Sequence, residues 1–109
     1  MIEPGDVVTA YLPGASETKR RPPVVVSTLA YHAARPDVLL ALITSQVQDA
    51  NTEFDAVIYD WREAGLKLPS AMRSFLFSKR AADVQRIGRL SNADWTEVQE
   101  RLRKAVELS

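Results

Sequence analysis

The 109-residue sequence predicts a single domain, all-β or α+β, built on a small and strongly bent sheet or barrel. Two observations predict this fold class. Short apolar segments alternate with turn residues along most of the chain, and a helical spacing of apolar residues occurs only at its end. A chain of this length buries about two thirds of its unfolded surface, enough for one core without disulfides or a metal. We therefore expect one domain over residues 1–109.

The first half of the chain contains three predicted strands. Residues 7–12 form a β-prone run between two Pro-Gly turn pairs, and residues 23–27 form the second strand. A connector with His32 and Pro36 follows. Residues 38–43 are apolar at every position, which is typical of a strand buried on both faces.

The second half begins with residues 54–59, where apolar and polar residues alternate as in a half-exposed strand. Residues 64–69 contain glycine and proline and predict a loop. A strand is expected at residues 70–77 and a short one at residues 85–90, with a helical turn over residues 81–87 as the alternative to the short strand.

The C-terminal segment predicts a helix. Ser91 is a suitable N-cap, and Asp94 three residues later gives a capping-box arrangement with Asp in the place of Glu. Four apolar residues then recur at helical spacing: Trp95, Val98, Leu102 and Val106. The opposite face is charged, so we expect the helix to pack on the sheet with Trp95 as its anchor.

The composition excludes several classes of chemistry. The chain has no cysteine, which rules out thiol catalysis, cysteine zinc sites and disulfides, and is compatible with a reducing cytoplasm. The N-terminus lacks the basic and apolar regions of a signal peptide, and no apolar run is long enough to span a bilayer. We therefore expect a soluble, cytoplasmic protein that makes no membrane contact.

The charges balance overall but are separated along the chain. Fourteen basic and fourteen acidic residues give zero net charge, which does not fit a general nucleic-acid binder. Residues 37–60 carry five anions and no cation, whereas residues 62–89 carry seven cations against two anions. If residues 19–35, also basic, meet the second basic segment in space, the two form a local positive surface for a phosphate backbone. The alternative is a set of solvated loops without function.

The basic run Lys19-Arg20-Arg21 is the most informative of these segments. Pro22-Pro23 ends it and leads directly into an apolar strand. The two prolines restrict the backbone and keep Arg21 out of the helical region, so its side chain is aimed by the backbone. An arginine held in this way usually binds an anion.

Five ordered pieces of the sequence resemble one known family. They are Gly5-Asp6-Val7-Val8, the run from Lys19 to Ser27, Ile43-Thr44-Ser45-Gln46, Ala64-Gly65-Leu66 with Pro69-Ser70 and Arg73, and Ile87-Gly88-Arg89-Leu90-Ser91 before the helix. In this order they cover nearly the whole chain, and they resemble the PemK/MazF toxins of bacterial type II toxin–antitoxin systems.

The resemblance implies a mainly β fold, a small SH3-like barrel of the CcdB/PemK type with short helices and a C-terminal helix. It implies a sequence-specific, metal-independent endoribonuclease that cuts single-stranded RNA and inhibits translation and growth. No cofactor is implied, and the implied partners are RNA, a cognate antitoxin and a second copy in a homodimer. The family's catalytic arginine falls on Arg21 and its conserved threonine or serine on Thr44.

The remaining RNA contacts implied by the resemblance fall on Lys19, Arg20, Ser45, Gln46, Ser70 and Arg73. One departure from the family pattern is Pro23, which stands where a small residue such as alanine is usual. This difference bears on cutting specificity.

The residues themselves fit a cleavage in which RNA supplies its own nucleophile, the 2′-hydroxyl. Arg21 can hold the phosphate bidentately and Thr44 can add a neutral hydrogen bond, so both stabilise charge on the phosphorane. A guanidinium is a poor general base, and the identity of the base stays open. His32 is the alternative acid or base, although we favour an ordinary loop role. Tyr11 and Phe77 are candidates either to stack a base or to fill the core.

A second class of function stays open, namely a binding module on the same fold that is catalytically silent or directed at a protein. The presence of both Arg21 and Thr44 favours the enzyme. No metal site is expected, because no convincing cluster of ligand side chains occurs in the sequence.

Overall fold

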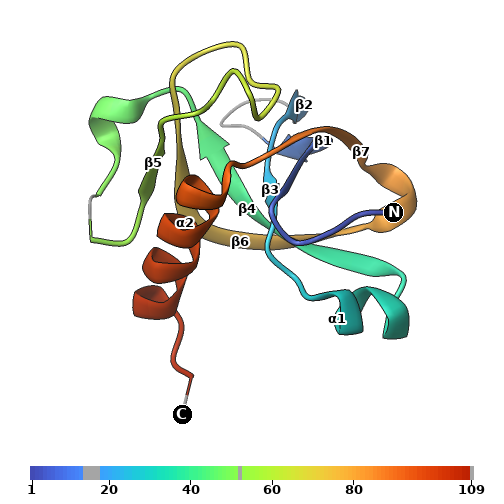
Figure 1. Ribbon diagram of the computed structural model, residues 1–109. Coiled ribbons are helices and arrows are strands. Elements are labelled where there is room, and N and C mark those ends of the chain that lie inside the picture. Colours follow the sequence, from blue (N-terminus) through green and yellow to red (C-terminus); the bar gives the residue numbers. More distant parts are fainter. Residues whose placement is uncertain (14–17, 52, 109) are drawn as a thin grey trace.

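The computed structural model of the protein describes residues 1–13, 18–51 and 53–108, and these are mainly β (Figure 1). They form one antiparallel sheet of seven strands: β1 (Asp6–Pro13), β2 (Thr18–Arg21), β3 (Val24–Val25), β4 (Asp37–Thr44), β5 (Ala56–Ile58), β6 (Ser70–Arg80) and β7 (Gln85–Arg89). Two helices accompany the sheet, α1 (Leu29–Ala34) and α2 (Asn92–Ala105), with short 3₁₀ turns at η1 (Val47–Asp49) and η2 (Ala81–Asp83). The predicted fold class is confirmed.

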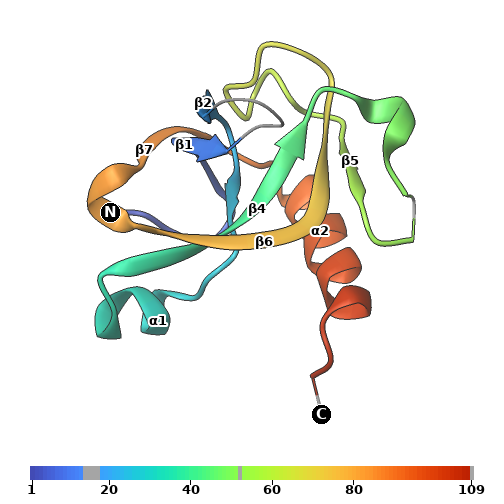
Figure 2. The same ribbon diagram turned by 180° about the vertical axis from the view of Figure 1, so that it is seen from behind.

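The strand order is β2-β1-β3-β4-β6-β5, and β7 also pairs with β1. The sheet curves strongly without closing into a complete ring. β4 and β6 cross the molecule as a long antiparallel pair, and α1 lies at the end of β4 that is remote from Thr44 (Figure 2). On the other side of the molecule α2 packs against β5 and β6.

β2 and β3 are two halves of one strand beside β1. Val7 pairs with Val24 and Ala10 with Arg21, so both halves keep the same register. The interruption falls at Pro22-Pro23, since proline has no N–H to give to the ladder. The sequence predicted a strand only from residue 23 onward, and the basic run before it belongs to the same strand.

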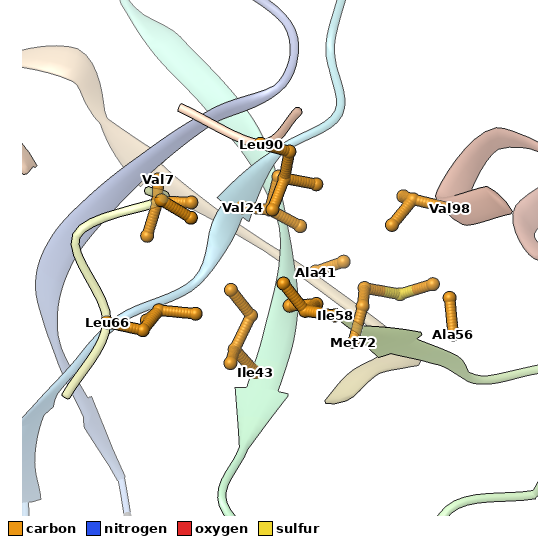
Figure 3. Close-up of a cluster of buried hydrophobic side chains, with 11 residues drawn as sticks. Val7, Val24, Ala41, Ile43, Ala56, Ile58, Leu66, Met72, Leu90 and Val98 are labelled. Atoms are coloured by element: carbon orange, nitrogen blue, oxygen red, sulfur yellow. The ribbon is translucent and has the colours of Figure 1, made fainter. Parts of the chain in front are cut away.

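The core consists of two clusters because both faces of the central strands are covered. Neighbouring residues such as Val7 and Val8, or Leu40 and Ala41, are fully buried on opposite faces. The larger cluster lies under α2 and includes Ile43, Ile58 and other residues drawn in Figure 3. The expectation that residues 38–43 are covered on both faces therefore holds, with Leu39 and Leu42 half-buried.

α2 begins as the sequence predicts. The Ser91 hydroxyl accepts a hydrogen bond from the backbone N–H of Asp94 at 3.2 Å, and Val98 is fully buried. The expected capping box was wrong in its second half, because the Asp94 carboxylate does not serve the helix. It accepts hydrogen bonds from the backbone N–H groups of Tyr59 and Asp60 at 3.2 and 2.9 Å, so it fastens the loop after β5 to the start of α2.

Three other local predictions need correction. The connector after β3 contains the short helix α1, capped by the Thr28 hydroxyl. Residues 81–90 hold both predicted alternatives in succession, η2 and then β7. Val106 does not extend the apolar face of α2, since the helix ends at Ala105 and Val106 is partly exposed.

Candidate functional site

A cleft of about 460 Å³ opens between β2, the end of β4 and the loop that precedes β6. Fourteen of the described residues line it, and they include six of the eight site residues that the sequence predicts: Arg20, Arg21, Thr44, Ser45, Gln46 and Ser70. These residues come from three separate parts of the chain. The fold therefore brings together pieces that the sequence keeps apart.

Arg21 lies on the inner face of β2. It pairs with Ala10, whose side chain is fully buried, so the arginine side chain shares the face that β1 turns toward the core. Within the described residues its Nε atom is buried and has no hydrogen-bond partner. A buried donor without an acceptor is costly in a native protein. Arg21 also lines the cleft, so its guanidinium can face an anion bound there.

Arg20 faces the other side of β2 and is held in place. Its Nη2 atom donates to the Thr9 hydroxyl at 2.5 Å and approaches the Gln85 side-chain oxygen at 3.5 Å. Its guanidinium also lies 5.2 Å from the centre of the Tyr11 ring. These contacts position a cation at the rim of the cleft and leave part of its donor capacity free.

Thr44 ends β4 with its hydroxyl oriented by the following turn. The hydroxyl oxygen accepts a hydrogen bond from the backbone N–H of Gln46 at 3.1 Å. Because the oxygen acts as acceptor in that bond, its own proton stays available for donation. Thr44 can therefore give a neutral hydrogen bond to a group in the cleft, beside the charge of Arg21.

Two glycines hold the remaining wall of the cleft. Gly65 has a φ of +84°, and a side chain on it would overlap the backbone carbonyl of Ile87. A side chain on Gly88 would likewise overlap the carbonyl of Ala64. The loop after β5 and strand β7 thus touch backbone to backbone. This contact requires glycine at both positions, 65 and 88.

The same loop adds a cation that the sequence analysis missed. Lys67 is exposed and lines the cleft. Ser70 also lines it, but its hydroxyl donates to the carbonyl of Leu68 at 2.8 Å and so shapes the loop. The signal for Lys67 was its place between Gly65 and Pro69, two residues that already marked a shaped loop.

Two predicted RNA contacts, Arg73 and Lys19, remain to be placed. Arg73 lies on β6 with its Nε atom 3.7 Å from an oxygen of Asp55, a buried carboxylate that belongs to a different hollow near the end of α2. Lys19 belongs to β2, but its side chain lies outside the described residues.

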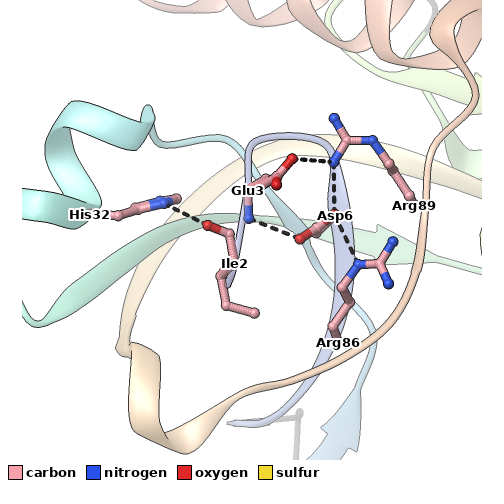
Figure 4. A network of polar contacts seen from close by, with 6 residues as sticks. All are labelled: Ile2, Glu3, Asp6, His32, Arg86 and Arg89. Atoms are coloured by element: carbon pink, nitrogen blue, oxygen red, sulfur yellow. Dashed lines mark hydrogen bonds and ion pairs between the residues drawn. The ribbon is translucent and has the colours of Figure 1, made fainter.

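His32 is far from the cleft and has a structural place. Its Nδ1 atom is 3.1 Å from the Ile2 carbonyl, and its Nε2 atom is 2.5 Å from the Ser27 hydroxyl. A carbonyl only accepts, so Nδ1 carries the proton and Nε2 accepts from serine when the ring is neutral. The histidine fastens the N-terminal segment to α1 (Figure 4).

Two further cations of the second basic segment, Arg86 and Arg89, are paired with carboxylates. The side chain of Asp6 is only 1% exposed. Its Oδ1 atom lies 3.1 Å from Nε of Arg86 and 2.9 Å from Nη1 of Arg89, and Arg89 also contacts the carboxylate of Glu3 (Figure 4). These pairs join β1 to β7 and neutralise the arginines. This pairing reduces the positive charge that the sequence pattern indicated, and the cations that line the cleft in the described part of the chain are Arg20, Arg21 and Lys67.

A third polar cluster lies at α1. The Tyr31 hydroxyl donates to Asp37 at 2.7 Å, and Arg35 contacts the same carboxylate at 3.1 Å. The hydrogen bond from Tyr31, followed by that from Arg35, lowers the pKa of Asp37, and the bond to Asp37 raises the pKa of Tyr31. This cluster joins α1 and its C-terminal end to the start of β4.

The described residues contain no group of three or more histidine, aspartate or glutamate side chains arranged to hold a metal ion. No helix in this part of the chain is long and apolar enough to cross a membrane.

Comparison with known proteins gives a family and a fold. Residues 3–106 match the family described as PemK-like, MazF-like toxin of type II toxin–antitoxin system. A comparison with curated protein sequences gave no match.

Several solved structures share the fold at low sequence identity. An endoribonuclease in complex with its cognate antitoxin from a Mycobacterial species has a TM-score of 0.77 and 16% identity, covering 96% of this chain and 94% of its own. The Mycobacterium tuberculosis toxin MazF-mt6 has a TM-score of 0.69 and 21% identity, with 89% and 91% covered. A MazE-MazF structure from Deinococcus radiodurans has a TM-score of 0.73 and 16% identity, with 98% and 96% covered.

Proposed function

Since the chain belongs to the PemK-like, MazF-like toxin family of type II toxin–antitoxin systems, we propose that it is an endoribonuclease that cuts single-stranded RNA in the cleft beside Arg21 and Thr44. The observation that carries this proposal is that Arg21 and Thr44, which lie far apart in the sequence, line one cleft together. A phosphate in that cleft would accept hydrogen bonds from the guanidinium of Arg21 and the hydroxyl of Thr44.

The cleft residues support a reaction in which the RNA attacks itself. The 2′-hydroxyl oxygen forms a bond to the neighbouring phosphorus, and the bond from phosphorus to the 5′-oxygen breaks. The 2′-hydroxyl loses its proton and the leaving 5′-oxygen gains one. The products therefore end in a 2′,3′-cyclic phosphate and a 5′-hydroxyl.

The protein's part in this reaction is to stabilise charge and to position the chain. Arg21 faces the phosphorane oxygens with a guanidinium, and Thr44 adds the hydroxyl proton that its bond to Gln46 leaves available. Arg20 and Lys67 stand at the rim, where they bind flanking phosphates. Arginine stays protonated, so the group that accepts the 2′-hydroxyl proton is left unassigned.

The same cleft explains the partners that we propose. Two of the similar structures are described as toxin–antitoxin complexes, one of an endoribonuclease with its cognate antitoxin and one of MazE with MazF. By analogy, an acidic antitoxin segment would fold along the cleft of this chain and exclude RNA. A homodimer would place the basic residues of two copies along one groove. Both RNA and antitoxin are made in the cytoplasm, where we place the protein.

The deciding experiment is incubation of the purified chain with a long single-stranded RNA in the presence of a chelator, followed by analysis of the fragment ends. We expect cutting with 2′,3′-cyclic phosphate and 5′-hydroxyl ends. A strand with deoxyribose at the scissile position should stay intact, because it lacks the nucleophile.

The outcomes separate the alternatives. Fragments with 5′-phosphate, or cutting only after magnesium is added, would disprove self-cleavage through the 2′-hydroxyl. A protein that binds RNA or another protein but leaves every RNA intact would be a binding module on this fold.

A further inference from the structure

A hollow of about 340 Å³ lies next to the cleft, and it is distinct from the one that contains Asp55 and Arg73. It is bounded by η1, the end of β5 and the turn before β6. Apolar and aromatic side chains dominate its lining, among them Val47, Tyr59, Trp61 and Pro69, and the polar side chains are those of Gln48 and Ser70. Among the described residues, no charged side chain lines this hollow, whereas Arg20, Arg21 and Lys67 line the cleft.

The hollow and the cleft adjoin each other. Ser70 lines both of them. Gln46 lines the cleft and Gln48 lines the hollow, and the Gln48 side-chain nitrogen donates to the Gln46 side-chain oxygen at 3.4 Å. An amide pair therefore crosses the boundary. A ligand that extends from the cleft past these amides would reach the hollow.

Tyr59 offers an aromatic surface on a fixed backbone. Its side chain is 75% exposed, while its backbone N–H is bound by the buried carboxylate of Asp94. The neighbouring ring of Trp61 is half-buried and carries the Arg62 guanidinium 4.5 Å from its centre. An exposed ring on a fixed support is suited to stacking with a planar base.

The division of charge decides which part of an RNA each region accepts. The cations of the cleft suit phosphates, whereas the uncharged, aromatic hollow suits a nucleobase. The amide pair has donor and acceptor capacity beyond its internal bond, as needed to read a base edge. Resting on the proposed RNA cleavage, we propose that this hollow is a nucleobase subsite, which stacks the unpaired base next to the scissile phosphate on Tyr59 and reads its edge with Gln48.

The test compares the wild-type protein with Tyr59→Ala, Tyr59→Phe and Gln48→Ala on a pool of random single-stranded RNA, with sequencing of the new 5′ ends. Tyr59→Ala should lower kcat/KM on the preferred motif about tenfold and weaken base preference at one position beside the cut. Gln48→Ala should weaken preference at the same position, and Tyr59→Phe should keep the wild-type rate and motif. Leu29→Ala, an exposed apolar residue on α1 outside both hollows, is the control and should change neither.

A substrate that carries an abasic site at that position gives an independent readout. The wild-type protein should lose about the same factor on this substrate as Tyr59→Ala loses on the intact one, and Tyr59→Ala should lose nothing further, because the two changes remove one contact. Equal rates and an unchanged motif in Tyr59→Ala and Gln48→Ala would overturn the subsite. So would variants that only weaken binding of an antitoxin. A wild-type protein that cuts no RNA would instead refute the proposed function, from which the subsite would fall as well.

Discussion

At the scale of single residues, partners decide what each cation can do. Arg21 and Arg73 are both arginines on strands and both were predicted to serve RNA. Arg73 faces the buried carboxylate of Asp55, whereas the Nε atom of Arg21 has no hydrogen-bond partner in the described part of the chain. The contact between Arg73 and Asp55 stabilises the fold, whereas Arg21 lines the cleft and can bind a ligand there.

Replacement of Arg21 is expected to disable cleavage. Arg21→Ala should lower kcat about a hundredfold or more, because one preorganised donor in such a site contributes about 3 kcal/mol to transition-state stabilisation. Thr44→Ala should lower kcat by a smaller factor, because a neutral donor stabilises developing charge less than a cation does. Single-turnover rates on a defined RNA measure both effects. Arg103→Ala, an exposed arginine on α2, is the control, and full activity in Arg21→Ala would move the site elsewhere.

The Tyr31–Asp37 pair should make stability depend on pH. The folded-state pKa of Asp37 is lowered by Tyr31 and Arg35, so its contribution is complete above the unfolded-state pKa. That contribution is lost as pH falls through the lower, folded-state pKa. The pKa of Tyr31 is raised, so its contribution is present below the unfolded-state pKa and is lost as pH rises through the folded-state value.

The free energy of unfolding in urea, measured from neutral pH into acid, tests the contribution of the Tyr31–Asp37 pair. Tyr31→Phe should be less stable than the wild-type protein at neutral pH, and the difference should vanish in acid, where Asp37 is protonated. In an Asp37→Asn background the same tyrosine change should show no acid dependence. A difference between Tyr31→Phe and wild type that is constant from neutral pH into acid would contradict the assignment.

At the scale of elements, the cleft depends on one backbone contact. Gly65 and Gly88 allow the loop before β6 to touch β7, and this contact places Lys67 and Leu68 opposite β2. The Asp94 carboxylate holds the start of the same connection through the backbone of Tyr59 and Asp60. The wall of the cleft is thus fixed at both ends.

Gly88→Ala is expected to lower both stability and activity. The added methyl group would overlap the carbonyl of Ala64, and relief of such overpacking costs about 1–3 kcal/mol. Because the loop must move away from β7, RNA cleavage should fall further than the loss of folded protein explains. Denaturant unfolding and activity per folded molecule are the measurements. Ser78→Ala, exposed on β6, serves as control, and unchanged stability in Gly88→Ala would show that the loop is held by other contacts.

At the scale of the whole molecule, zero net charge conceals one small positive region. The carboxylates of Asp6, Asp37 and Asp55 each pair with arginines outside the cleft. In the part of the chain that the structure describes, the cations that line the cleft are Arg20, Arg21 and Lys67. Local rather than total charge therefore decides which polyanion the protein attracts.

An acidic antitoxin segment should follow this local charge. Arg20→Glu and Lys67→Glu should each weaken binding of the antitoxin, whereas Arg73→Glu should leave it nearly unchanged, because Arg73 lies outside the cleft. Titration calorimetry with the antitoxin segment at two salt concentrations checks the effect. If all three variants bind equally well, the segment docks elsewhere.

Sedimentation at micromolar concentration tests the proposed homodimer, and a monomer would count against it.

Local properties of the fold could be predicted from the sequence because they depend on neighbouring residues. Turn pairs bound the strand at residues 7–12, and Ser91 begins the last helix. The order of five short pieces was enough to predict the family, which the match over residues 3–106 confirms.

Only the tertiary structure decided which charges meet. Asp6 neutralises Arg89 across 83 positions of the chain, and Gly65 packs on the carbonyl of Ile87. Neither contact has a local sequence signal, because electrostatic pairing and steric overlap depend on distance in space. For the same reason the sequence grouped Arg73 with Arg21 and overlooked Lys67, although the folded chain places Lys67 in the cleft and Arg73 against Asp55.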